Sequence, residues 1–452
     1  MVANDRQTIK CVGHSFALAS LQCGVQLSRP MQQAREILEH TFREEYGRII
    51  ATLIRISGSF DLAEEALQEA FASAVTNWEK GGPPQNPGAW LTTVAHRKLL
   101  DGLRREKTRS DKQSELEYET ERLAAGGEHS LFEETVEYAD DRLRLIFTCC
   151  HPTLNQESQV ALTLRTLGGL ATSEIARAFL VPEPTLAQRL VRAKNKIRIA
   201  GIPYQVPALE VLPQRLASVQ AVVYLIFNEG YTATSGEGLM RKDLCAEAIR
   251  LGRLLRELVP DEPENLGLLA LMLLQDSRRE ARINARGELV TLEEQERSLW
   301  DANEIGEGLR LVETALRLGR VGPYQLQAAI AAVHAEARAT EDTDWPQIVA
   351  LYSELRRINS SPVVALNHAA AVAMSEGCSE GLRLAEAAGA AGKLDHYYFY
   401  HAARADLLRR LDRTEEAQAA YMRALELTTN LVEQRYIHRR LNELTQTAIL
   451  HD

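Results

Sequence analysis

Residues 185–198 carry basic and amide side chains that could bind nucleic acid. Gln and Arg can make paired hydrogen bonds to the base edges exposed in the major groove of DNA, while Lys and Arg suit its phosphates. The side chains with these capacities are Thr185, Gln188, Arg189, Arg192, Lys194 and Lys196. Charged runs are more often solvated faces of ordinary helices, so these residues alone leave both interpretations open.

Two short helices separated by a tight turn are predicted to position this basic cluster. In the first helix, Ile175 and Phe179 recur at helical spacing. Pro182 and Pro184 then prevent one continuous helix, because each lacks an N–H and restricts the residue before it. Thr185 is expected to open the second helix. Its predicted inner face comprises Leu186, Leu190, Ala193 and Ile197. A helix with an apolar inner face and Gln and Arg near its start has the features of a major-groove reader.

A second basic cluster lies in a predicted helix over residues 89–105, after a loop at 80–88 that is rich in Gly and Pro. Its basic residues are Arg97, Lys98, Arg104 and Arg105. The preceding helix, with Asp61 as its expected N-cap, has an acidic and polar outer face. That face consists of Asp61, Glu64, Glu65, Gln68 and Glu69. Trp78 and Trp90 fall on the apolar stripes of these helices, which favours a place in the core over stacking on bases.

The charge distribution indicates two basic modules separated by an acidic linker. The net charge of −10 excludes a chain covered in DNA-binding surface. A local basic reader remains compatible with that charge, because salt screens charges beyond about 10 Å. An acidic stretch from Glu115 to Asp141 lies between the two basic clusters.

Both modules resemble conserved parts of extracytoplasmic-function (ECF) sigma factors. The run DLAEEALQEAFASAVTNW, followed by NPGAWLTTVAHRKLLDGLRRE, resembles their second conserved region. The later run TLRTLGGLATSEIARAFLVPEPTLAQRLVRAKNKIR resembles their fourth, the helix-turn-helix. The stretch DDRLRLIFTCCHP resembles one subgroup, whose members carry long C-terminal tetratricopeptide extensions. The two regions occur in the order of the family, which makes the resemblance specific.

The resemblance implies a role for each group of residues. Asp61, Glu64, Glu65, Gln68 and Glu69 match the helix that grips core RNA polymerase. Arg97, Lys98, Arg104 and Arg105 match the part that holds the minus-ten element. Thr185, Gln188, Arg189, Arg192, Lys194 and Lys196 match the helix that faces the minus-thirty-five element. Pro184 and Ala187 stand where relatives often carry Gly and a basic residue, so base preference cannot be transferred.

The C-terminal half is predicted to be helical and repetitive, which makes the whole chain an all-α protein. Two stretches place small, large and aromatic residues in the order of a tetratricopeptide repeat. These positions are Ala369, Val372, Gly381, Ala385 and Ala388 in one stretch, and Ala405, Leu408, Ala417, Tyr421 and Ala424 in the next. Stacked helix pairs of this kind present a concave surface, so a protein or peptide partner is expected there.

The expected organisation has six parts. These are a disordered extension at 1–30, a region 2-like domain at 31–110, an acidic linker at 111–135, a region 4-like helix-turn-helix domain at 136–200, a helical connecting domain at 201–300 and tetratricopeptide-like repeats at 301–452. A further helix is expected to begin near Leu292. The six cysteines form no CxxC pair, and no apolar run approaches the roughly 18 residues of a membrane span. We therefore expect a cytoplasmic protein without metal, cofactor or membrane partner.

The sequence predicts a sigma factor that binds core RNA polymerase and directs initiation at specific promoters. Its activity is expected to be controlled by its own C-terminal helical domain. The alternative is a helix-turn-helix activator or scaffold with a protein-binding repeat domain. The histidines are dispersed and form no acid–base or nucleophile constellation, so the chain is not expected to be an enzyme.

Overall fold

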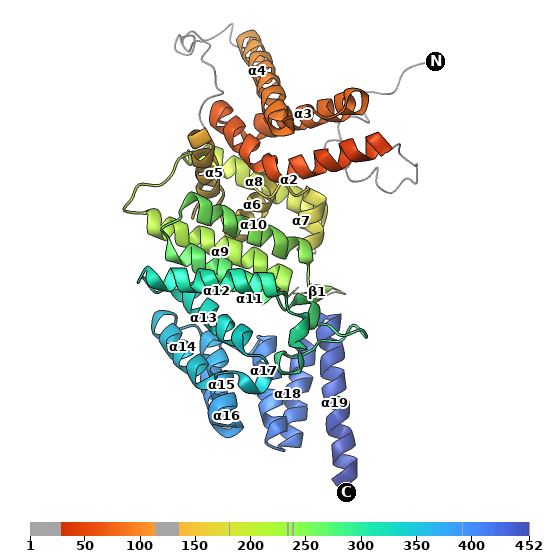
Figure 1. The fold of residues 1–452 in the computed structure, drawn as a ribbon, viewed down its shortest axis with the longest axis vertical. Helices are drawn as coiled ribbons and strands as arrows, with labels where there is room; N and C mark the ends of the chain where they lie inside the picture. The colour runs from red at the N-terminus through yellow and green to blue at the C-terminus, as the bar shows by residue number, and fades with distance from the viewer. Residues whose placement is uncertain are drawn as a thin grey trace. The chain divides into compact units, whose positions relative to one another are not determined.

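The computed structural model describes residues 29–113, 135–179, 181–232, 235–236, 239–390 and 392–451. Most of the predicted N-terminal extension and of the acidic linker therefore lies outside the described residues. The chain divides into two compact units, Met1–Val222 and Val223–Asp452, and the boundary falls within helix α9 (Leu212–Tyr231). Helices build both units (Figure 1), which confirms the all-α prediction. Each unit is described by itself.

The first unit begins with three helices that pack on one another, α2 (Arg29–Ser57), α3 (Phe60–Gly81) and α4 (Pro87–Gln113). Ile50, Leu67 and Leu91 are fully buried among them. The prediction of Asp61 as the N-cap of α3 is wrong. Ser59 takes that place, since its hydroxyl accepts a hydrogen bond from the Leu62 N–H, and Asp61 lies in the first turn. The loop before α4 is shorter than predicted, because a proline suits the first position of a helix.

Four further helices complete the first unit up to residue 199. They are α5 (Thr135–Cys149), α6 (Gln156–Thr166), α7 (Thr172–Ala178) and α8 (Glu183–Ile199). Helix α8 begins two residues earlier than predicted, with Pro182 as its N-cap residue and Pro184 in the first turn, where a missing N–H costs nothing. The predicted inner face of α8 is confirmed: Leu186, Leu190, Ala193 and Ile197 are all buried. Both α6 and α7 pack against this helix.

The two groups of helices in the first unit are joined by direct contacts. Helix α2 packs on α5, and the Arg55 guanidinium lies 2.9 Å from the buried carboxylate of Asp141. The Tyr204 hydroxyl lies within hydrogen-bond distance of two carbonyl oxygens, 2.9 Å from that of Ala51 in α2 and 3.0 Å from that of Asp141 in α5. Burial and the Asp141 charge raise the pKa of this hydroxyl, so Tyr204 is a neutral bridge between the groups.

A glycine allows the same two groups to approach closely. A Cβ atom at Gly47 of α2 would lie 2.9 Å from the Leu167 carbonyl oxygen, just after α6. That separation is shorter than real contacts of this kind, so a larger residue would force the backbones apart. The first unit is therefore one packed body across its described residues.

The second unit begins with helices around a nearly fully buried one, α11 (Pro263–Asp276). Helices α10 (Lys242–Leu258), α12 (Ala302–Arg317) and α13 (Pro323–Glu336) all pack against α11. The prediction of a helix from Leu292 is wrong. Residues 292–294 and 297–299 form two 3₁₀ turns, and α12 begins only at Ala302, where the Asp301 carboxylate accepts hydrogen bonds from the N–H groups of Asn303 and Glu304.

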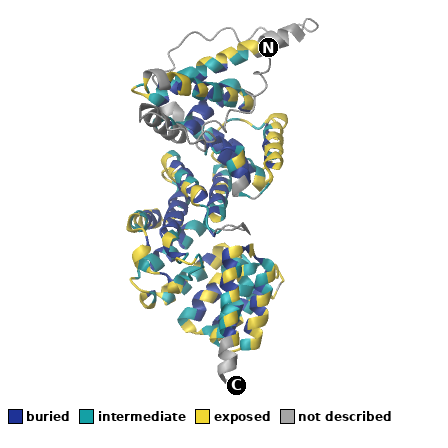
Figure 2. Cartoon of the chain, turned by 90° about the vertical axis from the view of Figure 1, so that its right-hand side faces the viewer, coloured by how far each residue is buried: buried dark blue, intermediate teal, exposed yellow. Residues whose placement is uncertain are grey.

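Six helices form the rest of the second unit in sequential contact. They are α14 (Trp345–Ile358), α15 (Pro362–Glu376), α16 (Cys378–Gly389), α17 (Tyr398–Arg410), α18 (Thr414–Leu427) and α19 (Leu431–His451). Residue pairs Ser235–Gly236 (β1) and Thr429–Asn430 (β2) form a short parallel ladder. Of the ten predicted repeat positions, Ala388 is partly buried and the other nine are buried. Figure 2 shows that buried residues run through the helices of the chain, with exposed residues on other faces.

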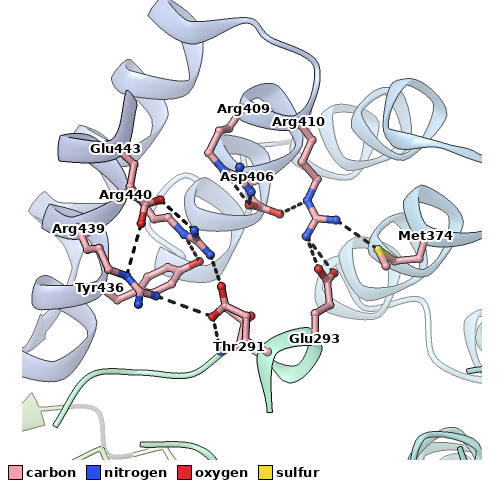
Figure 3. Close-up of polar contacts among 11 residues, drawn as sticks. Thr291, Glu293, Met374, Asp406, Arg409, Arg410, Tyr436, Arg439, Arg440 and Glu443 are labelled. Carbon is pink, nitrogen blue, oxygen red and sulfur yellow. Dashed lines mark hydrogen bonds and ion pairs between the residues drawn. The ribbon is translucent and has the colours of Figure 1, made fainter. Parts of the chain in front are cut away.

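An acidic segment before α12 is fastened to α17 and α19 (Figure 3). The Glu293 carboxylate lies 2.7 Å from the Arg410 guanidinium, and Glu294 lies 3.0 Å from Arg440. Burial raises the pKa of Glu294, but the Arg440 charge and the hydrogen bonds from Thr291 and Arg440 together outweigh burial and hold that pKa below its ordinary value. These ion pairs hold the segment against α17 and α19.

Candidate nucleic-acid and polymerase interface

The outer face of α8 presents most of the predicted DNA-contacting residues to solvent. Thr185, Gln188, Arg192 and Lys196 are exposed, as expected of a face that could enter a groove. Thr185 and Gln188 lie in the first two turns, which is where a recognition helix contacts bases. Arg192 and Lys196 follow one and two turns later and carry positive charge toward solvent.

Arg189 is held against a neighbouring helix. Its guanidinium lies 2.7 Å from the carboxylate of Glu157 in α6, and only 25% of its side chain is exposed. Charge-assisted pairs of this kind position a side chain firmly. The predicted base-reading role of Arg189 therefore requires this pair to open.

Lys194 joins α8 to the acidic face of α3. Its ammonium nitrogen lies 2.9 Å from Oε2 of Glu64 and 3.1 Å from Oδ1 of Asp61. The Lys194 and Glu64 side chains are 14% and 12% exposed, whereas Asp61 is 84% exposed. The structure thus brings one predicted DNA-contacting residue together with two predicted polymerase-contacting residues.

The remaining part of the acidic face lies beside α4. The Glu69 carboxylate is 3.2 Å from the Lys98 ammonium and 3.8 Å from the Arg105 guanidinium. Gln68 is half-buried and Glu65 is exposed. In the part of the chain that the structure describes, no ion pair involves Glu65. Glu65 is therefore the carboxylate of this face that is most available to a partner.

The basic residues of α4 lie mostly at the surface. Arg97 and Arg104 are exposed, and Arg104 lies 3.8 Å from Asp101 on its own helix. Trp78 is buried, and its ring meets that of Trp90 edge-on at 5.6 Å between centroids. The two tryptophans thus stabilise the contact between α3 and α4, as the apolar stripes predicted.

Sequence reasoning missed two outward residues of α8, Val191 and Asn195. Both are exposed, and they lie one and two turns beyond Ala187 on the same side of the helix. The outward position of Val191 could be predicted from the sequence, because residue 191 falls outside the apolar inner stripe that begins at Leu186. Val191 is thus an apolar residue exposed among polar ones on this side of α8.

The adjacent thiols at residues 149 and 150 have a structural role. The Cys149 sulfur lies 3.2 Å from the Thr166 hydroxyl, and Cys150 lies 3.6 Å from Thr163. Burial raises the pKa of both thiols, that of Cys150 to about 12, so neither is a ready nucleophile. Across the described residues, no three His, Cys, Asp or Glu side chains are placed to hold a metal ion. In the same residues, no helix combines the length and apolar character needed to cross a membrane.

Three stretches of the chain match known protein families. Residues 41–109 match Sigma-70 region 2, which covers α3, most of α4 and much of α2. Residues 144–197 match Sigma-70, region 4, from within α5 to near the end of α8. Residues 215–316 match a family of unknown function, DUF6596.

Two relatives are similar over longer stretches. Uncharacterized protein R00370 of Rhizobium meliloti (strain 1021) is 44% identical over 407 residues, which cover 87% of this chain and 93% of that protein. The ECF RNA polymerase sigma factor SigK of Mycobacterium ulcerans (strain Agy99) is 26% identical over 161 residues, which cover 35% of this chain and 81% of that protein.

The two sigma regions, together with the similarity to SigK over part of the chain, indicate an ECF-like sigma factor. Its class implies a sigma-factor-like role in transcription initiation. Within that class, the chain belongs to the family of R00370 of Rhizobium meliloti. The match at residues 215–316 is to a family of unknown function, so the tetratricopeptide character of the second unit stays a prediction.

Proposed function

We propose that this protein binds core RNA polymerase through α3, contacts the minus-ten element through α4 and reads the minus-thirty-five element through α8. The observation that carries the proposal is the presence of both sigma regions in one packed unit, with Gln188, Arg192 and Lys196 exposed on the second helix of the helix-turn-helix. Because both partners are cytoplasmic in bacteria, the protein would act there. No step in this role requires catalysis by the chain itself.

Polymerase binding is assigned to the acidic face of α3. Asp61 and Glu65 are exposed, and an exposed carboxylate pair on a rigid helix suits a basic patch on a protein partner. Asp61 and Glu64 are engaged with Lys194, and Glu69 with Lys98, in this structure. Docking of polymerase would therefore exchange these internal ion pairs for intermolecular ones.

Control of initiation is assigned to the second unit. The chain continues for more than two hundred residues beyond the sigma regions, and these residues fold into a compact unit of their own. The buried small residues of α15–α18 support the proposal that these helices are tetratricopeptide-like and bind a protein or peptide partner. The second unit would either mask the DNA-reading helices or support their engagement when that partner binds.

Transcription in vitro tests both parts of the proposal. Full-length protein and a variant that ends at Val222 are each mixed with purified core polymerase and a genomic promoter library. This boundary keeps Arg215, whose guanidinium donates to the Phe147 carbonyl oxygen within the first unit. Promoter-specific transcripts from the full chain are expected, and a rise on truncation supports masking whereas a loss supports a positive role.

The activator hypothesis predicts a different outcome. A helix-turn-helix activator or scaffold would not form a stoichiometric holoenzyme in the absence of the housekeeping sigma factor. Gel filtration of the chain with core polymerase distinguishes the two, because a sigma factor co-elutes with the core enzyme. Separate elution of the folded chain would overturn the proposal.

A further inference from the structure

Three arginines between α11 and α12 lack acidic partners. Arg282 is 8% exposed, and Arg278 and Arg297 are half-buried. Among the described residues, no carboxylate forms an ion pair with any of the three, whereas the adjacent Arg279 pairs with Asp276 and with a second carboxylate in α12. Buried arginines are normally paired, because removing a charge from water is costly. These three positive charges are thus left without the counter-charge that such groups usually have.

Two aromatic rings connect the three arginines into one cluster. The Arg282 guanidinium lies over the Tyr231 ring, 3.7 Å from its centroid. The guanidinium groups of Arg278 and Arg297 lie over the Trp300 ring, at 5.7 and 4.7 Å from its centroid. Arg278 also donates a hydrogen bond to the Tyr231 hydroxyl at 2.9 Å. The rings attract cations through their quadrupoles, but they carry no net negative charge.

His334 of α13 lies at the same place and adds no negative charge. Arg297 donates hydrogen bonds to the carbonyl oxygens of His334 and Ala337, 3.0 Å from the latter. Burial and the charges of Arg278 and Arg297 lower the pKa of His334 to about 4, so its ring is neutral at neutral pH. In a neutral imidazole one ring nitrogen still carries a proton that can be donated.

The positive charges of the cluster also act on one another. Burial lowers the pKa of Arg282 and that of Arg297, and the Arg278 charge lowers both further. Carboxylates that lie beyond ion-pair distance offset this in part, Glu433 at Arg282 and Asp342 and Glu341 at Arg297. The free protein therefore keeps like charges together at a place that favours an anion.

Four nitrogen atoms of the cluster are buried without a hydrogen-bond partner. They are Nε of Arg278, Nε of Arg297, Nε1 of Trp300 and Nδ1 of His334. Trp300 is only 7% exposed, so bulk water does not readily serve its N–H group. Buried polar groups usually have a partner, and those that lack one often mark the place of a water or an ion. Water would satisfy these groups but leave the charges unopposed, whereas an anion would do both.

We propose that Arg278 and Arg297, together with Trp300 and His334, form a binding site for the phosphate group of a small molecule. Two guanidinium charges match the charge of a phosphate group, which is about −2 at neutral pH. The planar fork of arginine also fits phosphate oxygens. Since both arginines are half-buried, the cluster is within reach of solvent. A phosphate bound there would tie the 3₁₀ turn at 297–299 to the residues after α11, and so give the second unit a small-molecule ligand that the proposed function does not require.

Equilibrium dialysis of the full chain against radiolabelled inorganic phosphate tests the site. Sodium chloride holds the ionic strength constant, so that screening does not change during the titration. The wild type is expected to bind phosphate saturably, at one site per chain. Unlabelled glycerol phosphate will displace the label if the site accepts a phosphate monoester. If only unlabelled inorganic phosphate displaces it, the ligand is the free ion.

Two variants and one control locate the binding. Arg278→Gln should weaken phosphate binding about tenfold or more, the effect of losing a hydrogen bond between charged groups. Trp300→Phe keeps an aromatic ring beside the guanidinium groups and removes an N–H that has no partner in the free protein, so it should weaken binding severalfold without costing a hydrogen bond on folding. Arg286→Gln is the matched control, because Arg286 is exposed on the same connecting segment, and it should bind like the wild type.

Each outcome bears on the site alone. Circular dichroism checks the fold of each variant, and Trp300→Phe decides the matter if Arg278→Gln is unfolded. Unchanged phosphate affinity in folded Arg278→Gln or in Trp300→Phe would overturn the site, as would the absence of saturable binding by the wild type. Weakening by Arg286→Gln to the same extent would also overturn it, since binding would then follow overall charge. Core polymerase and DNA take no part in these measurements, so a failure of the proposed function would leave them unchanged.

Discussion

The ammonium group of Lys194 lies 2.9 Å from Oε2 of Glu64, and this ion pair connects the second helix of the helix-turn-helix to the acidic face of α3. Both side chains are largely buried, so the pair is screened little by salt. One ammonium cannot serve a carboxylate and a DNA phosphate with full strength at the same time. The face of α8 that we propose contacts DNA and the face of α3 that we propose binds polymerase therefore share one charge.

Glu64→Gln is expected to raise the affinity of the isolated chain for DNA several-fold. The amide preserves the shape of Glu64 but removes the nearer of the two carboxylate charges that compete with phosphate for Lys194, while Asp61 remains at 3.1 Å. Fluorescence anisotropy with a labelled duplex measures the gain, and the slope of log affinity against log salt should steepen by up to about one. The double variant with Lys194→Gln should show no gain, and a gain in that background would contradict the competition.

Gln188→Ala and Lys196→Ala should weaken DNA binding in different ways. Loss of Gln188 removes a base-edge contact, so preference among promoters should relax by about 1–3 kcal/mol at one position. Loss of Lys196 should weaken binding to all promoters alike and reduce the slope of log affinity against log salt by about one. Competition binding over a panel of promoters and salt concentrations separates the two, and identical behaviour would refute these roles.

Glu65→Lys is expected to impair holoenzyme formation without disturbing the fold. Glu65 is exposed on α3, so the charge reversal leaves the core untouched but repels a basic partner surface. Co-elution with core polymerase is the measurement, with circular dichroism to check the fold. Glu210→Lys makes the same charge change at another exposed position, and it should bind normally.

The stability of the second unit should fall as pH rises from about 4.5 to 7 because of Glu304. Burial and the Asp276 carboxylate raise the pKa of Glu304 from 4.5 to about 7, despite the Arg279 guanidinium at 2.9 Å. Across this window the folded state holds a proton that the unfolded state has lost, so ionisation costs stability.

The variant Glu304→Gln checks this pH dependence. The wild type is expected to lose about 1–3 kcal/mol of stability across this pH window, and the variant should lose less. Thermal unfolding at pH 5 and pH 7 makes the comparison, and Glu313→Gln on the same helix controls for loss of a carboxylate, since Glu313 is 65% exposed. An unchanged pH dependence in Glu304→Gln would assign the effect to another group.

Apolar spacing and helix-breaking residues predicted most of the helices. The features that were not predicted involve contacts between residues far apart in the sequence. The inner face of α8 followed from apolar spacing and two prolines, and Asn155 caps α6 as its position in the sequence indicates. In place of the helix expected from Leu292 there are two 3₁₀ turns, and the contacts of Glu293 and Glu294 with arginines 117 and 146 positions away could not be read from a local pattern.

In the candidate site, too, local patterns predicted some features and contacts between distant residues determine others. The exposure of Gln188, Arg192 and Lys196 could be read from helical periodicity alone. The contact of Lys194 with Asp61 spans 133 positions and depends on how α8 meets α3, which no local signal encodes. The outward place of Val191, in contrast, follows from helical periodicity, because residue 191 falls outside the buried stripe.

The close approach at Gly47 makes the packing of the first unit depend on a missing side chain. A Cβ atom at residue 47 would lie 2.9 Å from the Leu167 carbonyl oxygen, so alanine or serine there would have to push α2 away from the end of α6. The Arg55–Asp141 ion pair and the Tyr204 hydroxyl join the same two groups of helices, and both would have to follow that shift.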